Sequence, residues 1–79
     1  MHLKTTVIVP GIGDVDVSTV SLGLSGLGTG YETCLFWGER LSEVMAWYNS
    51  PALAHAGHAK WCDPALIARE IEAARVERE

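Results

Sequence analysis

This chain has few of the residues that usually reveal a chemistry. Its 79 residues include two cysteines, one phenylalanine and six lysines or arginines, and the cations are scattered along the chain. Scattered cations on a chain of net charge −4 argue against general nucleic-acid binding, which uses a concentrated basic face. The sequence also has no apolar run approaching the roughly 20 residues of a membrane-spanning helix. We therefore expect neither general nucleic-acid binding nor membrane binding.

An N-terminal targeting pattern is missing as well. Lys4 precedes only a short aliphatic run at 7–9, which is too short for the core of a signal peptide. We expect a cytoplasmic protein in which Cys34 and Cys62 are reduced. The length predicts a single domain over 1–79, and a core this small predicts a homo-oligomer.

The first part of the chain has the patterns of β-strands. Residues 3–9 are rich in β-branched types, and 10–14 supply turn residues. The alternation over 15–24 predicts either one strand bent near 18–19 or two short strands. Residues 31–37 form the strongest predicted strand.

A turn at 38–40 and a return strand at 43–48 complete a predicted hairpin. Trp37 and Trp47 are expected to lie near each other across it, either as cross-strand packing or as an exposed aromatic platform.

The glycine-rich stretch 23–30 has the composition of a phosphate-binding loop but the wrong position. A phosphate cradle lies between a strand and the N-terminus of a helix, whereas this stretch leads into a strand. The Gly-Lys-Ser/Thr motif is also missing from the sequence. We predict a connection between two strands here.

Two helix starts follow the hairpin. Ser50 before Pro51 predicts a helix over 51–61, and Asp63 before proline predicts another over 64–77, with a charged, frayed end at about 75–79. The helical period places the following residues on the sheet-facing sides: Leu53, Ala54, Gly57 and Trp61, then Leu66, Ile67, Ile71 and Ala74. Glycine in a helix favours a close approach of the backbone to the sheet. The predicted fold class is α+β, a small antiparallel sheet of three to four strands with two C-terminal helices on one face.

Two constellations could carry function. The first is an anion pocket in which aromatic rings stack a base while cations hold phosphate. Its candidate ligand-binding residues are Tyr31, Trp37, Arg40, Trp47, His55, His58 and Lys60. The alternative is that Arg40 and Lys60 are solvated surface charges.

The second constellation is His55, His58 and Cys62, which share one helix face and could bind zinc with Cys34 or His2 as a fourth ligand. The alternative is a polar stripe with a half-buried histidine, because the usual paired ligand modules are missing. A cysteine–histidine nucleophile would need a geometry that nothing in the sequence specifies. We expect no enzyme, no catalytic residue, no metal and no cofactor.

Tyr31-Glu32-Thr33-Cys34-Leu35-Phe36, then Trp47-Tyr48-Asn49-Ser50, then Ala54-His55-Ala56-Gly57-His58 resemble short uncharacterised proteins of tailed phages and prophages. Their pattern is Tyr-Glu-Thr-Met-Val-Phe, a strand ending in Tyr and a small polar residue, and Glu-Ala-x-x-Gly-His. The match covers about residues 31–62. Cys34-Leu35 replaces Met-Val, and Leu53-Ala54 stands in place of Glu-Ala.

What the resemblance implies is a phage accessory protein in the cytoplasm of the host cell. We expect a non-catalytic, oligomeric binding module that captures an anionic, nucleotide-derived host defence signal or binds a host defence protein. The alternatives are a virion or assembly protein and a small zinc-stabilised domain.

Overall fold

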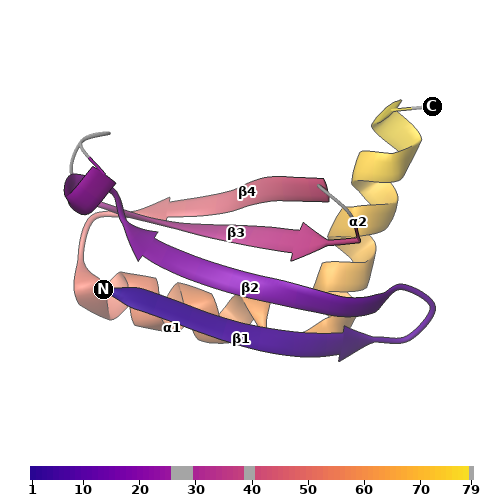
Figure 1. Ribbon diagram of the computed structural model, residues 1–79, viewed down its shortest axis with the longest axis horizontal. Coiled ribbons are helices and arrows are strands. Elements are labelled where there is room, and N and C mark those ends of the chain that lie inside the picture. The colour runs from indigo at the N-terminus through magenta and orange to yellow at the C-terminus, as the bar shows by residue number, and fades with distance from the viewer. Residues whose placement is uncertain (26–29, 39–40, 79) are drawn as a thin grey trace.

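The computed structural model describes residues 1–25, 30–38 and 41–78. It contains a four-stranded antiparallel sheet followed by two helices, which confirms the α+β fold class (Figure 1). The elements are β1 (His2–Val9), β2 (Gly13–Ser21), the short 3-10 helix η1 (Leu22–Ser25), β3 (Tyr31–Trp37), β4 (Leu41–Tyr48), α1 (Pro51–Trp61) and α2 (Pro64–Arg78).

The strands lie in the order in which they occur in the chain, β1-β2-β3-β4, so β1 and β4 form the two edges of the sheet. Gly11 and Gly13 adopt positive φ angles of 81° and 107° in the turn between β1 and β2, a conformation that favours glycine. The turn is closed by the amide of Ile12, which donates to the carbonyl oxygen of Val9 at 3.0 Å.

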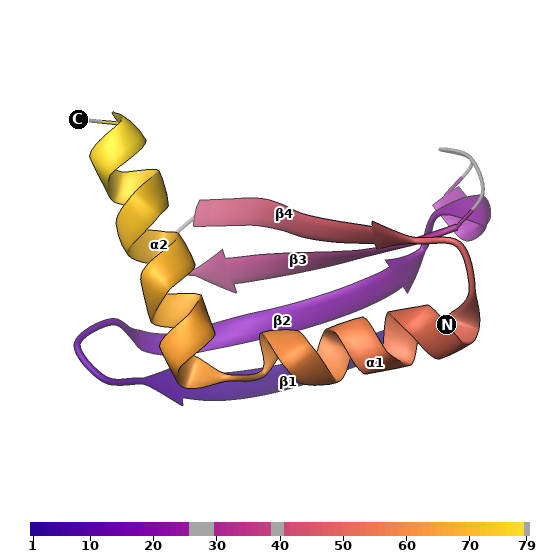
Figure 2. The same cartoon turned by 180° about the vertical axis from the view of Figure 1, so that it is seen from behind.

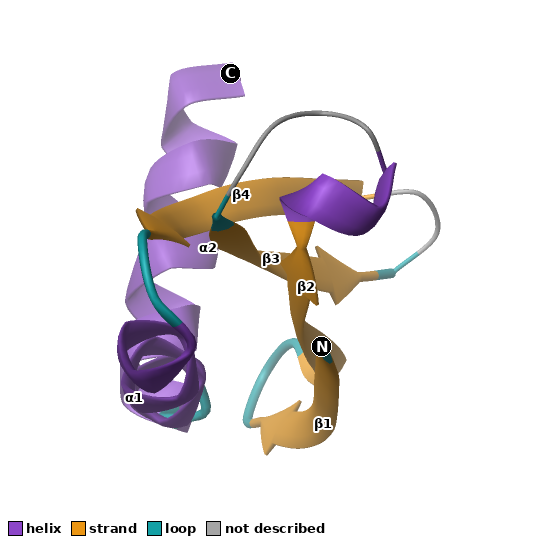
Figure 3. Cartoon of the chain, turned by 90° about the vertical axis from the view of Figure 1, so that its left-hand side faces the viewer, coloured by secondary structure: helices purple, strands orange, loops and turns teal. Residues whose placement is uncertain are grey.

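The helices α1 and α2 pack on the same face of the sheet, and neither of them covers the opposite face (Figures 2 and 3). Ser50 caps α1 by accepting a hydrogen bond from the amide of Leu53 at 3.2 Å, and Asp63 caps α2 by accepting one from the amide of Ala65 at 2.9 Å. The two predicted helix starts are therefore confirmed. We call the side of the sheet that faces the helices the covered face, and the other side of the sheet the open face.

The core lies between the covered face and the two helices. Its buried members come from five elements and are Val9, Val15, Val17, Leu35, Trp37, Trp61, Ile67 and Ile71. Trp37 and Ile71 place this core at the end of the sheet where α2 crosses it. Burial of these apolar side chains is the main force that holds the helices to the sheet.

The predicted proximity of Trp37 and Trp47 is wrong. Trp37 pairs with Leu41 at one end of the hairpin, whereas Trp47 pairs with Glu32 at the other end. Alternation along the strands then places Trp37 on the covered face and Trp47 on the open face. The two rings therefore share neither an end nor a face of the sheet.

Other predicted details also change. The stretch 15–24 is one strand that ends at Ser21 and continues as η1, and β4 begins at Leu41, two residues earlier than predicted. Leu53 is 56% exposed, because α1 turns Ala54, His58 and Trp61 toward the sheet instead. Residues 26–29 of the predicted loop and residues 39–40 of the predicted turn lie outside the described residues.

Candidate functional site: a buried polar joint and an open apolar face

Helix α1 is joined to the sheet by a chain of polar side chains, of which Thr19, Thr33 and His58 are buried and Thr5 is exposed. The Nδ1 atom of His58 lies 2.8 Å from Oγ1 of Thr19, and its Nε2 atom lies 3.0 Å from Oγ1 of Thr5. The hydroxyls of Thr19 and Thr33 lie 2.6 Å apart. This polar joint, formed by Thr5, Thr19, Thr33 and His58, links one helix to three strands.

A neutral imidazole suits the polar joint, because it donates with one ring nitrogen and accepts with the other while each hydroxyl does both. His58 is only 8% exposed, and burial lowers the pKa of its imidazole below the usual 6.5, helped by the nearby His55. Burial without compensation is costly for a polar group, so the joint is stable because its members satisfy one another.

Gly57 lies against the side chain of Tyr48, next to the polar joint. A Cβ atom at Gly57 would overlap the Tyr48 hydroxyl and ring, so the helix approaches β4 as closely as it does because this residue has no side chain. This confirms the predicted role of Gly57. The Tyr48 hydroxyl is buried and has no hydrogen-bond partner among the described residues.

Three segments on which the predicted resemblance rests meet at this place. Thr33 comes from the Tyr-Glu-Thr segment, Tyr48 ends β4, and Gly57 and His58 form the Gly-His pair. Hydrogen bonds and the Gly57–Tyr48 contact join these segments directly or through Thr19. These contacts give Thr33, Tyr48, Gly57 and His58 a structural role in the docking of α1 on the sheet.

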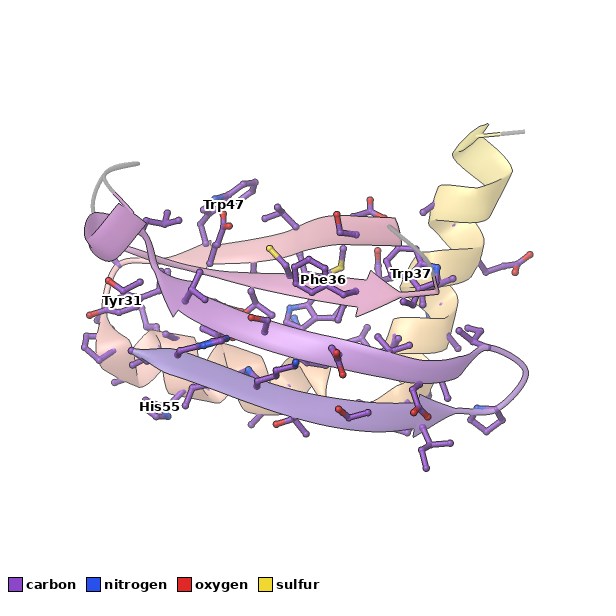
Figure 4. The ribbon with its side chains drawn as sticks, in the orientation of Figure 1. Tyr31, Phe36, Trp37, Trp47 and His55 are labelled. Carbon is purple, nitrogen blue, oxygen red and sulfur yellow. The ribbon has the colours of Figure 1, made fainter. Side chains whose placement is uncertain are left out.

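The open face differs between its two pairs of strands (Figure 4). It is mostly polar on β1 and β2 and mostly apolar on β3 and β4. On β1 and β2 the polar side chains pair with one another. Asp16 accepts a hydrogen bond from Thr6 at 2.7 Å and lies 3.6 Å from Nζ of Lys4, and His2 lies 3.3 Å from the Ser18 hydroxyl. This half of the open face is consistent with an ordinary solvated surface.

On β3 and β4 the same face is apolar and exposed. Phe36 is 46% exposed, Val44 40% and Trp47 68%, and Figure 4 shows Phe36 and Trp47 on the side away from the helices. We call Phe36, Val44 and Trp47 the β3–β4 patch. Val44 is paired with Cys34, and Trp47 with Glu32, so these two half-buried residues adjoin it. Large exposed apolar side chains that cluster in this way are typical of interaction surfaces.

The thiol of Cys34, at the edge of the patch, has a raised pKa. Burial raises its pKa from 9.0 to about 11, assisted by the negative charge of Glu32 and by a hydrogen bond from the thiol to that carboxylate at 3.6 Å. A thiol with this pKa is almost entirely protonated at neutral pH, and nucleophilic chemistry requires the thiolate. Cys34 is therefore suited to packing rather than to reaction.

The predicted ligand-binding residues are spread over the molecule. Trp47 lies on the open face, Trp37 is buried in the core, and Tyr31 is half-buried on the covered face at the start of β3. His55 and Lys60 are exposed on α1, where Nζ of Lys60 lies 5.6 Å from the centre of the Trp61 ring.

The two remaining residues of the predicted ligand-binding set are His58 and Arg40. His58 lies between helix and sheet, with both ring nitrogens engaged in the polar joint, and Arg40 lies outside the described residues. The described residues of the predicted set therefore do not line one common pocket. Sequence reasoning missed Phe36 and Val44, although their alternation with the buried Leu35 and Trp37 and with half-buried neighbours was a signal for the open face.

The three candidate metal ligands, His55, His58 and Cys62, lie in different environments. His55 is exposed, His58 is buried in the polar joint, and Cys62 is the half-buried C-cap residue of α1. Within residues 1–25, 30–38 and 41–78, no group of three or more His, Cys, Asp or Glu side chains could hold a metal ion. In the same part of the chain, neither helix is long and apolar enough to cross a membrane.

Comparison with known proteins yields no match: no family model, curated protein or solved structure is similar to this chain.

Proposed function

We propose that this protein is a non-catalytic binding module that holds another protein against the β3–β4 patch. The observation that carries the proposal is the exposure of Trp47, 68% on a face that neither helix covers. Exposing a large aromatic ring on the same face as Phe36 and Val44 favours burial against an apolar partner surface. A phage accessory role in the host cytoplasm, with a host protein as partner, is the biological form of this proposal and derives from the resemblance.

A protein partner has more support than the anionic ligand predicted from the sequence. Lys60 and His55 lie on α1, across the sheet from Trp47, and Lys4 on the open face is paired with Asp16. The carboxylate of Glu32, which pairs with Trp47, is unfavourable for an anion at the patch. Homo-oligomerisation stays a prediction that rests on the small size of the core.

The proposal can be tested by site-specific photo-crosslinking in bacterial cells that produce the full chain. A photoreactive phenylalanine analogue replaces Ser42, which is exposed beside Phe36, or in a second strain Ala56, which is exposed on the outer side of α1. We expect one discrete adduct with a cellular protein from position 42 and none of that mass from position 56.

Two matched substitutions decide whether the adduct depends on the patch. Trp47→Ser should remove it, whereas Ile8→Ser, at a 75% exposed apolar residue on β1, should leave it unchanged. An adduct that survives Trp47→Ser, or that disappears equally with Ile8→Ser, would contradict the proposal.

A further inference from the structure

The β3–β4 patch extends to an edge of the sheet where no described strand pairs with the outer side of the backbone. Strand β4 is the last strand in the order, and Val44 and Trp47 of the patch belong to it. Its sequence, LSEVMAWY, contains no proline, lysine or arginine, so the features of β4 that protect an edge strand are one bulge and the inward charge of Glu43. One register shift opposite Thr33 and Cys34 interrupts the ladder, and pairing is regular on both sides of it.

Helix α2 adds a second element beside this edge. Its C-terminal turns rise past β4, on the side of the covered face, in both Figure 1 and Figure 3. A strand added next to β4 would therefore lie beneath the projecting end of α2 on one face and would continue the apolar patch on the other.

Charge specifies which kind of strand fits. Glu43 is half-buried on the covered face, where it pairs with Leu35, and it has no ion-pair partner among the described residues. Side chains of a strand alternate between faces, so one and the same segment can place apolar residues beside Val44 and Trp47 and basic residues beside Glu43. A second copy of this chain would instead bring another Glu43 and another net charge of −4 to the edge.

We infer that β4 accepts an added strand from the bound protein, an extended segment that alternates apolar residues with lysine or arginine. This inference rests on the proposed function, because it specifies how the partner of the β3–β4 patch is bound. Backbone hydrogen bonds along β4 would supply affinity, and the alternating side chains would supply specificity.

The test is a titration of the 15N-labelled full chain with a synthetic peptide of alternating lysine and valine, compared with one of alternating glutamate and valine. We expect the lysine peptide to shift the amide resonances of β4 (Leu41–Tyr48) and to slow hydrogen exchange there, with the amides of β1 unchanged. The glutamate peptide should have neither effect.

A charge reversal makes the test specific for Glu43. Glu43→Lys should weaken binding of the lysine peptide by about two- to fivefold, the range of a single partly exposed ion pair, and should permit binding of the glutamate peptide. Asp14→Lys changes the net charge by the same amount at an exposed residue of β2, in the row that pairs with Ile8, and should leave both titrations unchanged.

Each remaining outcome overturns the inference. These outcomes are no change with either peptide, equal changes with both, changes at β1 instead, or protection of β4 that rises with protein concentration alone. If the lysine peptide shifts the Trp47 indole but not the β4 amides, strand addition is excluded while the proposed function stands. If photo-crosslinking from Ser42 fails although the lysine peptide adds to β4, the proposed function fails instead.

Discussion

Each face of this sheet carries some side chains of the kind that is usual on the other face. The covered face buries three polar side chains, Thr19, Thr33 and His58, and the open face exposes Phe36 and Trp47. The buried polar groups are satisfied by one another, whereas the exposed apolar groups have no partner of their own kind in the described chain to cover them. His58 and Trp47 lie in one segment of the sequence, but His58 is buried between helix and sheet and Trp47 is exposed on the open face.

The difference has consequences for stability. A buried hydrogen-bonded histidine contributes to folding, because its removal leaves a cavity and unpaired hydroxyls. An exposed tryptophan contributes little to folding, because much of its surface is already in contact with water.

Replacing His58 by alanine should lower the free energy of unfolding by about 2–4 kcal/mol, because the change opens a cavity and leaves Thr5 and Thr19 without their imidazole partner. Urea unfolding followed by tryptophan fluorescence measures this. His55→Ala, at an exposed histidine of the same helix, is the matched control and should change stability by less than about 0.5 kcal/mol. Equal effects of the two substitutions would refute the role of the polar joint.

Replacing Gly57 by alanine should lower stability by up to about 2 kcal/mol. Alanine gains about 1 kcal/mol in helix propensity, but its methyl group would overlap the Tyr48 side chain, and overpacking of this kind costs about 1–3 kcal/mol. Thermal and urea unfolding both report the difference.

The control is the same substitution in a Tyr48→Ala background, where the methyl group has room. There Gly57→Ala should be neutral or stabilising relative to Tyr48→Ala alone. A loss of the same size in both backgrounds would show that the close contact with Tyr48 is not its cause.

Lowering the pH should destabilise the protein through His58. Its pKa in the folded state lies below the usual 6.5, so the unfolded chain binds a proton that the folded chain resists. The contribution is fully present above pH 6.5 and is lost progressively as the pH falls from there through the folded pKa. Urea unfolding between pH 7.5 and 5 should show this slope in the wild type and a smaller slope in His58→Gln, and identical slopes would contradict it.

The smallest effect concerns the thiol beside the β3–β4 patch. Glu32→Gln removes the negative charge and weakens the hydrogen bond acceptor that help to raise the pKa of Cys34 to about 11, so the pKa should fall and alkylation should become faster. Iodoacetamide modification followed by mass spectrometry, in a Cys62→Ser background, measures the rate for Cys34 alone. Asp14→Asn removes a charge elsewhere on the open face and should leave the rate unchanged.

Much of the fold follows from local sequence signals. The caps Ser50 and Asp63 and the run Tyr31–Trp37 are strong local features, and the structure places helices and a strand at these positions. Gly57 also predicted a close contact between helix and sheet. Glycine is unfavourable inside a helix, so its presence there suggested that a side chain would not fit.

The candidate site could not be predicted in the same way, because it depends on register. The positions of Trp37 and Trp47 follow from the pairing of Trp37 with Leu41, which a strand pattern does not specify. The partners of His58 come from β1 and β2, up to 53 residues away in the chain, and no local pattern relates them.

Equilibrium urea unfolding of the double variant Phe36→Ser/Trp47→Ser, compared with Thr19→Val, tests the central claim most directly. Thr19→Val keeps the side-chain volume but removes the hydroxyl that joins His58 to Thr33, and it should lower stability by about 1–3 kcal/mol. The open-face double variant should remain within about 1 kcal/mol of the wild type, because its side chains are available for a partner rather than needed for the fold. A loss in the double variant as large as that of Thr19→Val would contradict the account and would place Phe36 and Trp47 among the residues that hold the protein together.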